Sequence, residues 1–273
     1  MTSPLGAAPA KVKRLANSIL APLGARVITK ADEESIAKRY DRVVKQVIAV
    51  YEESIFPELT PRPGRHELIS QLIGTEIPEA MHLLHYLQEA LSGPGEVCEM
   101  GVAQGATSAL IANEILDTDR VLWLYDSFEG LSAPTVEDVL LDDVLNLGSM
   151  GRYAGAMAVP VKQLESKLKA VGFPVDRTRI VAGFIRSDLP PDQIPPEVAF
   201  AYIDFDLFHP ILTGLQILHP RCRSGSVLMV DDYKYFSSGA EAAVRAFIDS
   251  HSEQYTLIEA TPAAGHFCVL RRR

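Results

Sequence analysis

The strongest constraint on this chain comes from two apolar, strand-like runs that each end in aspartate. The run 199–203 leads into Asp204, and the run 225–230 leads into Asp231 and Asp232. Apolar runs of this kind are typical of central strands of a parallel sheet, which are buried on both faces. Because the carboxyl ends of parallel strands meet at one edge, and α/β sheets bind their ligands there, the sequence predicts an α/β fold with its site at these aspartates.

Three carboxylates gathered at one edge also predict a metal ion. In a partly buried site they repel one another unless a cation lies between them. Oxygen ligands suit a hard divalent ion, Mg²⁺ first and Mn²⁺ or Ca²⁺ next. The alternative is that each aspartate only forms a turn or caps a helix. Two such strand ends, one of them doubled, favour a metal site made of Asp204, Asp231 and Asp232.

Composition narrows the range of partners. The chain has 273 residues, of which 47% are hydrophobic, enough for one sizeable α/β domain. A formal charge of −9 disfavours a nucleic-acid backbone or an anionic membrane as partner. No apolar run is long enough for a membrane span. Cys98, Cys222 and Cys268 are far apart and lie in apolar surroundings, as reduced core thiols of a cytoplasmic protein do.

The order of helical and strand-like patterns predicts three regions. Residues 1–30 are rich in Ala, Pro and Gly and are expected to form a flexible N-terminal arm. Residues 31–92 carry helical periodicity and are expected to be a helical extension that covers the site, covers the sheet or makes a dimer contact. We expect a homodimer or higher homo-oligomer. Residues 93–273 alternate strand and helix, as a mostly parallel sheet with helices on both faces requires.

A long insertion interrupts this alternation at about residues 131–160. It contains an acidic segment, with Glu137, Asp138, Asp142 and Asp143, followed by a segment rich in Gly and Met. An interval of this length beside a binding edge is more often a lid or a substrate loop than packing material.

The first strand of the α/β region runs into the loop Glu99-x-Gly101-x-x-x-Gly105. This is not the Gly-x-Gly-x-x-Gly dinucleotide fingerprint, and no P-loop lysine follows it. A ligand without a pyrophosphate, S-adenosylmethionine, fits such a loop. Gly101 would let the backbone approach the methionyl part, and Glu99 would lie near its ammonium group. Asp126, at the end of the second strand, would accept hydrogen bonds from the ribose hydroxyls, by the logic that places an acid on the ribose of NAD.

Further cofactor contacts are expected around these residues. Gly183, Phe184 and Ile185 follow the third strand, where the adenine could rest, although Phe184 and Ile185 could equally be core residues. The full predicted set for the cofactor is Glu99, Met100, Gly101, Gly105, Thr107, Ser108, Asp126, Ser127, Phe128, Gly183, Phe184, Ile185 and Asp204.

Four motifs, in their order and spacing, resemble the macrocin O-methyltransferase family. They are Glu99-Met-Gly-Val-Ala-Gln-Gly-Ala, Tyr125-Asp-Ser-Phe-Glu-Gly-Leu, Ile203-Asp-Phe-Asp-Leu-Phe and Val230-Asp-Asp-Tyr. The resemblance covers about residues 60 to 270. It implies the seven-stranded class I methyltransferase sheet, S-adenosylmethionine as donor and a magnesium ion on Asp204, Asp231 and Asp232. It also implies a sugar hydroxyl of an antibiotic as acceptor, with Asp206 as general base.

The chain departs from the family pattern beside the expected acceptor. Phe205 stands where the family usually has Gly between its two acids, and His209-Pro210 replace an acidic residue followed by Ser. The acceptor is therefore the part of the resemblance that transfers least directly. Leu207 stands where related catechol methyltransferases have a lysine, which argues against a lysine base.

The base is expected to be Asp206 or His209. An alcohol must lose its proton to attack a sulfonium methyl group, and coordination to Mg²⁺ lowers its pKa. If the strand stays extended to its end, Asp204 and Asp206 point to the same side, so that one binds metal and the other takes the proton. His209 is the rival because imidazole titrates near neutral pH, although a His before Pro at a helix start is more often structural.

Two other functions fit parts of the pattern. Ile203-Asp-Phe-Asp-Leu-Phe also looks like the nucleophile motif of haloacid dehalogenase-type phosphatases, but that motif normally begins its domain. A non-catalytic S-adenosylmethionine-binding protein is the second alternative, and the three metal-type aspartates argue against it.

Overall fold

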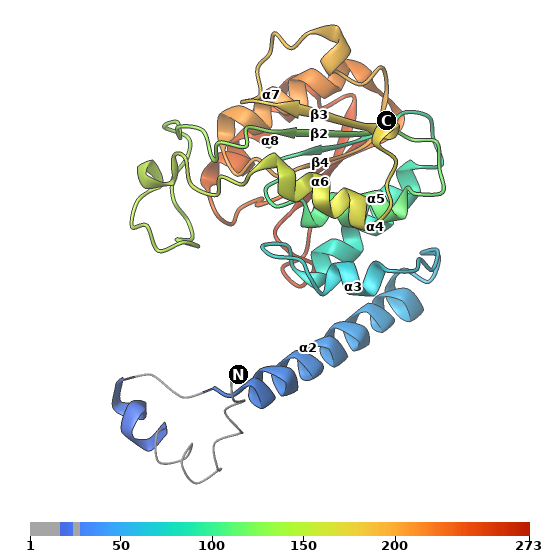
Figure 1. Ribbon diagram of the computed structural model, residues 1–273. Helices are drawn as coiled ribbons and strands as arrows, with labels where there is room; N and C mark the ends of the chain where they lie inside the picture. The colour runs from blue at the N-terminus through green and yellow to red at the C-terminus, as the bar shows by residue number, and fades with distance from the viewer. Residues whose placement is uncertain (1–16, 24–27) are drawn as a thin grey trace. The chain divides into compact units, whose positions relative to one another are not determined.

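The computed structural model describes residues 17–23 and 28–273, and the chain divides into two compact units, Met1–Gln46 and Val47–Arg273 (Figure 1). The described part of the first unit holds the 3-10 turn η1 (Ala21–Leu23) and most of helix α2 (Lys30–Val50), which ends in the second unit. Most of the N-terminal arm predicted at residues 1–30 lies outside the described residues.

The second unit contains a seven-stranded sheet of the predicted class. Its strands are β1 (Glu96–Met100), β2 (Leu122–Asp126), β3 (Thr178–Ala182), β4 (Val198–Ile203), β5 (Cys222–Val230), β6 (Tyr255–Glu259) and β7 (Cys268–Arg272). Their order is β3-β2-β1-β4-β5-β7-β6, and only β7 runs antiparallel to its neighbours. The predicted seven-stranded methyltransferase sheet is confirmed. Every residue of β4 is buried, as its unbroken apolar run predicts.

Helices cover both faces of this sheet (Figure 1). The helical elements of the second unit are η2 (Tyr51–Ile55, a π-turn), α3 (Arg65–Ile69), α4 (Ile77–Ala90), α5 (Ala106–Glu114), η3 (Met150–Tyr153), α6 (Val161–Ala170), η4 (Val175–Arg177), η5 (Pro191–Gln193), α7 (Phe208–Leu218), η6 (His219–Arg221) and α8 (Ser238–His251). α7 packs on α8, and α5 packs on α6 and α3. α4 contacts β4 and β5, so it covers the sheet, one of the roles that the sequence left open.

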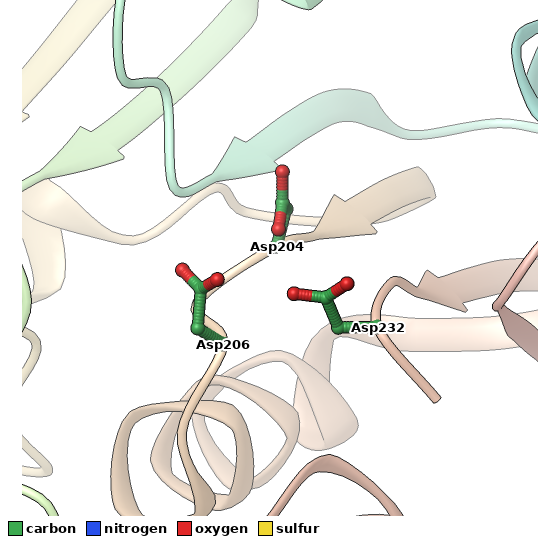
Figure 2. Close-up of side chains that lie close together, drawn as sticks. All are labelled: Asp204, Asp206 and Asp232. Carbon is green, nitrogen blue, oxygen red and sulfur yellow. The ribbon is translucent and has the colours of Figure 1, made fainter. Parts of the chain in front are cut away.

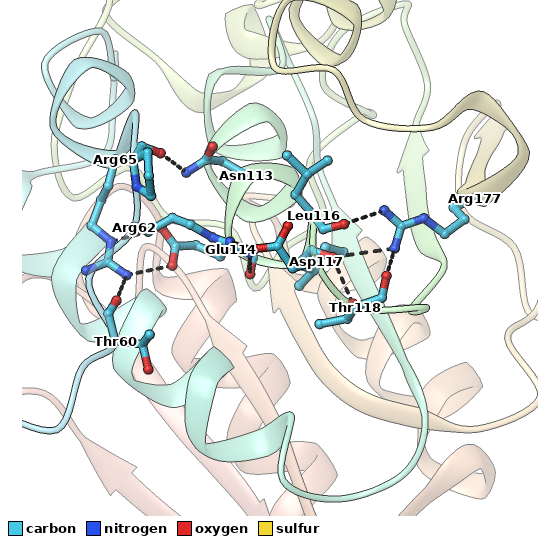
Figure 3. Close-up of polar contacts among 11 residues, drawn as sticks. Thr60, Arg62, Arg65, Asn113, Glu114, Leu116, Asp117, Thr118 and Arg177 are labelled. Atoms are coloured by element: carbon cyan, nitrogen blue, oxygen red, sulfur yellow. Dashed lines mark hydrogen bonds and ion pairs between the residues drawn. The ribbon is translucent and has the colours of Figure 1, made fainter.

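The segment before α4 is attached to α5 through a buried arginine (Figure 3). Arg65 is 2% exposed. Its guanidinium donates to both carboxylate oxygens of Glu114 at 2.9 and 2.7 Å, to Glu52 Oε1 at 2.7 Å and to the Thr60 carbonyl at 2.6 Å. A buried charge is stable only when it is paired and hydrogen-bonded in this way.

A second arginine on the same segment makes a more exposed contact with the same end of α5. Arg62 pairs with Asp117, which is 77% exposed, and donates to the Glu114 carbonyl at 2.7 Å. Exposed pairs of this kind are screened by water and contribute little. Arg65 is therefore the main polar link between this segment and α5.

The insertion at residues 131–160 shares a small hydrophobic core with the α/β domain. Met150 and Tyr153 pack with Leu207 and Phe236, which belong to the α/β domain. A β-bridge joins Leu140 to Ser237. The insertion is thus packed against the carboxyl edge of the sheet.

None of the helices in the described parts of the chain combines the length and the apolar character that a membrane span needs.

Candidate active site

A cavity of about 580 Å³ opens at the carboxyl edge of the parallel strands. This volume is within the range of small-molecule sites, roughly 300–1,000 Å³. Of the residues predicted from the sequence, those that line it are Gly101, Thr107, Asp126, Ser127, Phe184, Ile185, Asp204, Asp206, Asp231 and Asp232. The strand ends predicted to form the site therefore share one cavity.

Three aspartates that line this cavity lie close together (Figure 2). Asp204 follows β4, Asp206 follows two residues later, and Asp232 follows β5. One carboxylate oxygen from each lies within 4.8 Å of the others, a spacing that one metal ion can bridge. Asp204 and Asp232 were predicted as ligands, whereas Asp206, predicted as base, occupies the third place in this group.

The backbone turns sharply at two of these aspartates. β4 ends at Ile203, and Asp206 has a φ of 63°, in the left-handed region. Asp232 has a φ of 54°. The condition of a strand extended through Asp206 is not met, and the left-handed turn rather than strand alternation brings its carboxylate to Asp204. Non-glycine residues with this conformation cost free energy and cluster at functional sites.

The carboxylates raise one another's pKa. Burial and the charges of neighbouring aspartates raise the pKa of Asp204 and of Asp232 well above the usual value. Burial also raises the pKa of Asp206 to about 6, with further contributions from nearby negative charges and an opposing hydrogen bond from Asp232. Among the described residues, no Lys, Arg or His lines the cavity to offset this charge. A hard divalent cation fits this all-oxygen, uncompensated donor set.

Asp231 is held by a different set of contacts. Its Oδ2 accepts a hydrogen bond from the buried Tyr202 hydroxyl, and its Oδ1 accepts one from the Asp232 amide at 2.8 Å. The Tyr202 hydroxyl also lies 3.3 Å from Oε1 of Glu79, which comes from α4 and is 4% exposed. Burial and the charge of Asp231 raise the pKa of Glu79 well above its usual value. The sequence had given no indication of Glu79.

Gly101 lies in the predicted cofactor loop and closely approaches Asp204, one of the three clustered aspartates. Its φ is 91°, and an added Cβ would overlap the carbonyl oxygen of Asp204. Gly101 also lines the cavity. The close approach to Asp204 is a second reason for glycine here, and only the structure shows it.

Asp126 organises the same loop while it faces the cavity. Its Oδ2 accepts hydrogen bonds from the amides of Val102 and Ala103, at 2.7 and 2.9 Å. Its Oδ1 accepts one from the Phe128 amide at 2.6 Å. Since a carboxylate oxygen can accept two hydrogen bonds, Oδ1 keeps capacity for a ligand hydroxyl.

Glu99 lies beneath the loop, outside the cavity lining. It is 1% exposed, and Ser108 Oγ donates to its Oε2. Its Oε1 has no hydrogen-bond partner among the described residues. Burial raises the pKa of Glu99 to about 8. Glu99 comes two residues before Gly101, which lines the cavity, and its place near the ammonium group of the donor stays a prediction.

The remaining predicted residues also lie outside the cavity lining. Met100 is a buried core residue, and Gly105 caps α5 with a φ of 74°. Phe128 and Gly183 lie next to lining residues. His209 is exposed at the start of α7, and the structure does not bring it to the aspartates.

Several lining residues were not predicted individually. Ile73, Gly74 and Thr75 come from the turn before α4, where the sequence carries no recognisable motif. Val144, Leu145, Met157 and Val159 come from the insertion, whose length was the only available signal.

A protein-family model describes residues 79–267 of this chain, and it is that of the macrocin O-methyltransferases (TylF). The chain belongs to this family. It is therefore an S-adenosylmethionine-dependent O-methyltransferase, as the four sequence motifs had predicted. The phosphatase and the non-catalytic alternatives are wrong.

Curated relatives match most of the catalytic domain of this methyltransferase. A tetracenomycin rhamnosyl 4'-O-methyltransferase from Streptomyces olivaceus is 26% identical over 185 residues, 62% of this chain and 69% of the relative. The mycinamicin III 3''-O-methyltransferase of Micromonospora griseorubida is 26% identical over 186 residues, 65% of this chain and 70% of the relative. The solved O-methyltransferase NovP superposes with a TM-score of 0.61 at 18% identity, covering 85% of this chain and 99% of NovP, which shows the shared fold.

Proposed function

We propose that this methyltransferase transfers the methyl group of S-adenosylmethionine to a sugar hydroxyl of a glycosylated small molecule, with Mg²⁺ at the aspartate cluster. The observation that carries the proposal is that Asp204, Asp206 and Asp232 meet in a cavity that is also lined by the loop after β1, where S-adenosylmethionine is predicted to bind. The name of one curated relative describes 4'-O-methylation of a rhamnosyl tetracenomycin, and the name of the other describes 3''-O-methylation of mycinamicin III.

The walls of the cavity fit an uncharged acceptor. Val144, Leu145, Met157 and Phe184 line it and are each 38–45% exposed, so apolar surface is available there. All the charged side chains in the lining are aspartates. A glycoside with an apolar aglycone matches these walls, and among the described residues no Lys, Arg or His lines the cavity to pair with an anionic group.

Asp204 and Asp232 would hold the cation, since the sequence and the geometry agree on both. We propose Asp231 as the additional ligand, because hydrogen bonds from Tyr202 and from the Asp232 amide fix its carboxylate, as hydrogen bonds from neighbouring groups orient metal ligands. The bound cation would lower the pKa of the acceptor hydroxyl and orient it.

Asp206 would then accept the proton of the acceptor hydroxyl. It lies within the same 4.8 Å group, and a pKa of about 6 leaves it ionised at neutral pH. A neighbouring cation favours the ionised carboxylate, so the pKa of Asp206 falls when metal binds. Activity should therefore rise with pH only up to about 6, where Asp206 is already ionised, and stay constant above it.

The assay for the reaction follows methyl transfer from labelled S-adenosylmethionine to a panel of glycosides and their matching aglycones. We expect transfer to the glycosides, loss of activity in EDTA and recovery on addition of Mg²⁺. Full activity in EDTA would overturn the metal proposal, and equal transfer to the aglycones would overturn the sugar assignment.

Two isosteric variants separate the base from the ligand. Asp206→Asn should lower kcat by about 10²–10⁴-fold, the usual contribution of a general base, while Mn²⁺ binding measured by electron paramagnetic resonance stays intact. Asp231→Asn should weaken Mn²⁺ binding. The reverse pattern would make Asp206 the ligand.

A further inference from the structure

The acidic segment of the insertion contains one aspartate that is almost fully buried. Asp138 is 6% exposed and accepts four hydrogen bonds. Its Oδ2 accepts from the Thr135 amide at 2.7 Å and from the Thr135 hydroxyl at 3.1 Å. Its Oδ1 accepts from the Phe208 amide at 2.8 Å and from the Ser237 hydroxyl at 3.1 Å. One oxygen thus organises the insertion, and the other reaches the α/β domain.

Two hydrogen-bond partners of Asp138, Phe208 and Ser237, lie in the α/β domain. They come shortly after the loops that contain the clustered aspartates Asp206 and Asp232. Phe208 is the first residue of α7, two positions after Asp206. Ser237 caps α8, five positions after Asp232, and its hydroxyl accepts from the Gly239 amide. The Asp138 carboxylate therefore bridges the starts of two helices whose preceding loops supply two of the three clustered aspartates.

The surroundings of Asp138 are shaped to admit its carboxylate. An added Cβ at Gly239 would overlap Asp138 Oδ1 and would lie 2.7 Å from the Phe208 amide nitrogen. The α7 cap residue, Leu207, has no capping side chain of its own, so Asp138 supplies the acceptor across 70 positions of sequence. The negative charge also lies at the positive ends of two helix dipoles.

We propose that Asp138 is a positioning residue that holds the Asp206 and Asp232 loops at the separation that the metal site requires. It touches neither cavity nor cluster and acts through the first turns of α7 and α8. The left-handed backbone at Asp206 and Asp232 makes such support necessary, because strained residues keep their conformation only where surrounding contacts fix it. This inference rests on the metal-dependent function proposed above.

The test compares two aspartates of the insertion. Asp138→Asn keeps the size and shape of the side chain but replaces one acceptor oxygen with an NH₂ group. This group then faces a hydrogen-bond donor and cannot accept from it. The matched control is Asp143→Asn. Asp143 also accepts three hydrogen bonds, from the Leu147 and Gly148 amides and the Tyr153 hydroxyl, each at 2.7 Å, but all of these partners lie within the insertion.

The readout is Mn²⁺ binding by electron paramagnetic resonance, without donor or acceptor, together with S-adenosylhomocysteine binding by calorimetry as a check of the fold. Loss of a hydrogen bond made directly to a metal ligand typically weakens metal binding by about 10–100-fold, and Asp138 acts one step further away, through the two loops, so the lower end applies. We expect about a tenfold weaker Mn²⁺ affinity for Asp138→Asn and a change below twofold for Asp143→Asn. Turnover of Asp138→Asn should recover at high Mg²⁺, as a raised KM for the metal with a preserved kcat.

Unchanged Mn²⁺ affinity in Asp138→Asn would overturn the inference, and so would an equal loss in Asp143→Asn. If Asp138→Asn does not fold, Ser237→Ala removes one contact to Asp138, and unchanged Mn²⁺ affinity in that variant would overturn the inference instead. Absence of Mn²⁺ binding by the unmodified protein would be a failure of the metal proposal itself. This outcome distinguishes a failure of the proposed function from a failure of the inference about Asp138.

Discussion

Replacement of Arg65 by methionine should cause a large loss of stability, because it leaves two acidic side chains without their partner. The guanidinium is 2% exposed and makes four hydrogen bonds, two of them to a Glu114 side chain that is only 10% exposed (Figure 3). Removing one member of a buried ion pair costs about 3–5 kcal/mol, mostly because the other charge stays buried.

The expected shift in melting temperature follows from the size of the unit. For a domain of about 150–250 residues, 1 kcal/mol corresponds to about 2–4 °C, so Arg65→Met should lower Tm by roughly 6–20 °C. Differential scanning calorimetry and urea unfolding would measure the change.

Arg62→Met is the matched control. Arg62 contacts the same end of α5, but its acidic partner is exposed, so the loss should be about 1 kcal/mol. Combining Arg65→Met with Glu114→Gln should recover part of the stability, because the buried carboxylate is then neutral. Equal losses in Arg65→Met and Arg62→Met would refute the reasoning that burial decides the contribution.

Three further predictions concern the site. Gly101→Ala should abolish turnover and weaken S-adenosylhomocysteine binding at least tenfold in calorimetry, because its Cβ would displace the Asp204 carbonyl; near-normal binding would contradict this close approach. Burial raises the pKa of Glu99 from 4.5 to about 8, so the folded state holds the proton of Glu99 more tightly than the unfolded state does. The stability that this difference contributes is complete below about pH 4.5 and is lost as the pH rises to about 8. Glu99→Gln should therefore raise Tm relative to the unmodified protein more at pH 8 than at pH 5, and a gain independent of pH would exclude the shift. His209→Ala should keep kcat within twofold in the methyl-transfer assay, since His209 is exposed and outside the cavity, whereas a loss above 100-fold would restore it as the base.

The alternation of strands and helices could be predicted from the sequence because it depends on local periodicity. The unbroken apolar run of β4 and the glycine loop after β1 were sufficient to indicate a parallel sheet with a binding edge. Short α3 was missed, because five residues carry no detectable period and its position depends on the buried Arg65.

The sequence by itself determined that aspartates from two adjacent strand ends lie at one edge of the sheet, since strand direction and burial require it. Only the tertiary structure decided which carboxylates meet. The left-handed turns at Asp206 and Asp232 bring these two to Asp204, while the Tyr202 hydroxyl orients the Asp231 carboxylate and also contacts Glu79, a residue far away in the sequence. The physical reason is that side-chain direction at the end of a strand depends on backbone angles and hydrogen bonds fixed by distant segments, such as the insertion that contributes Asp138, and no local pattern encodes them.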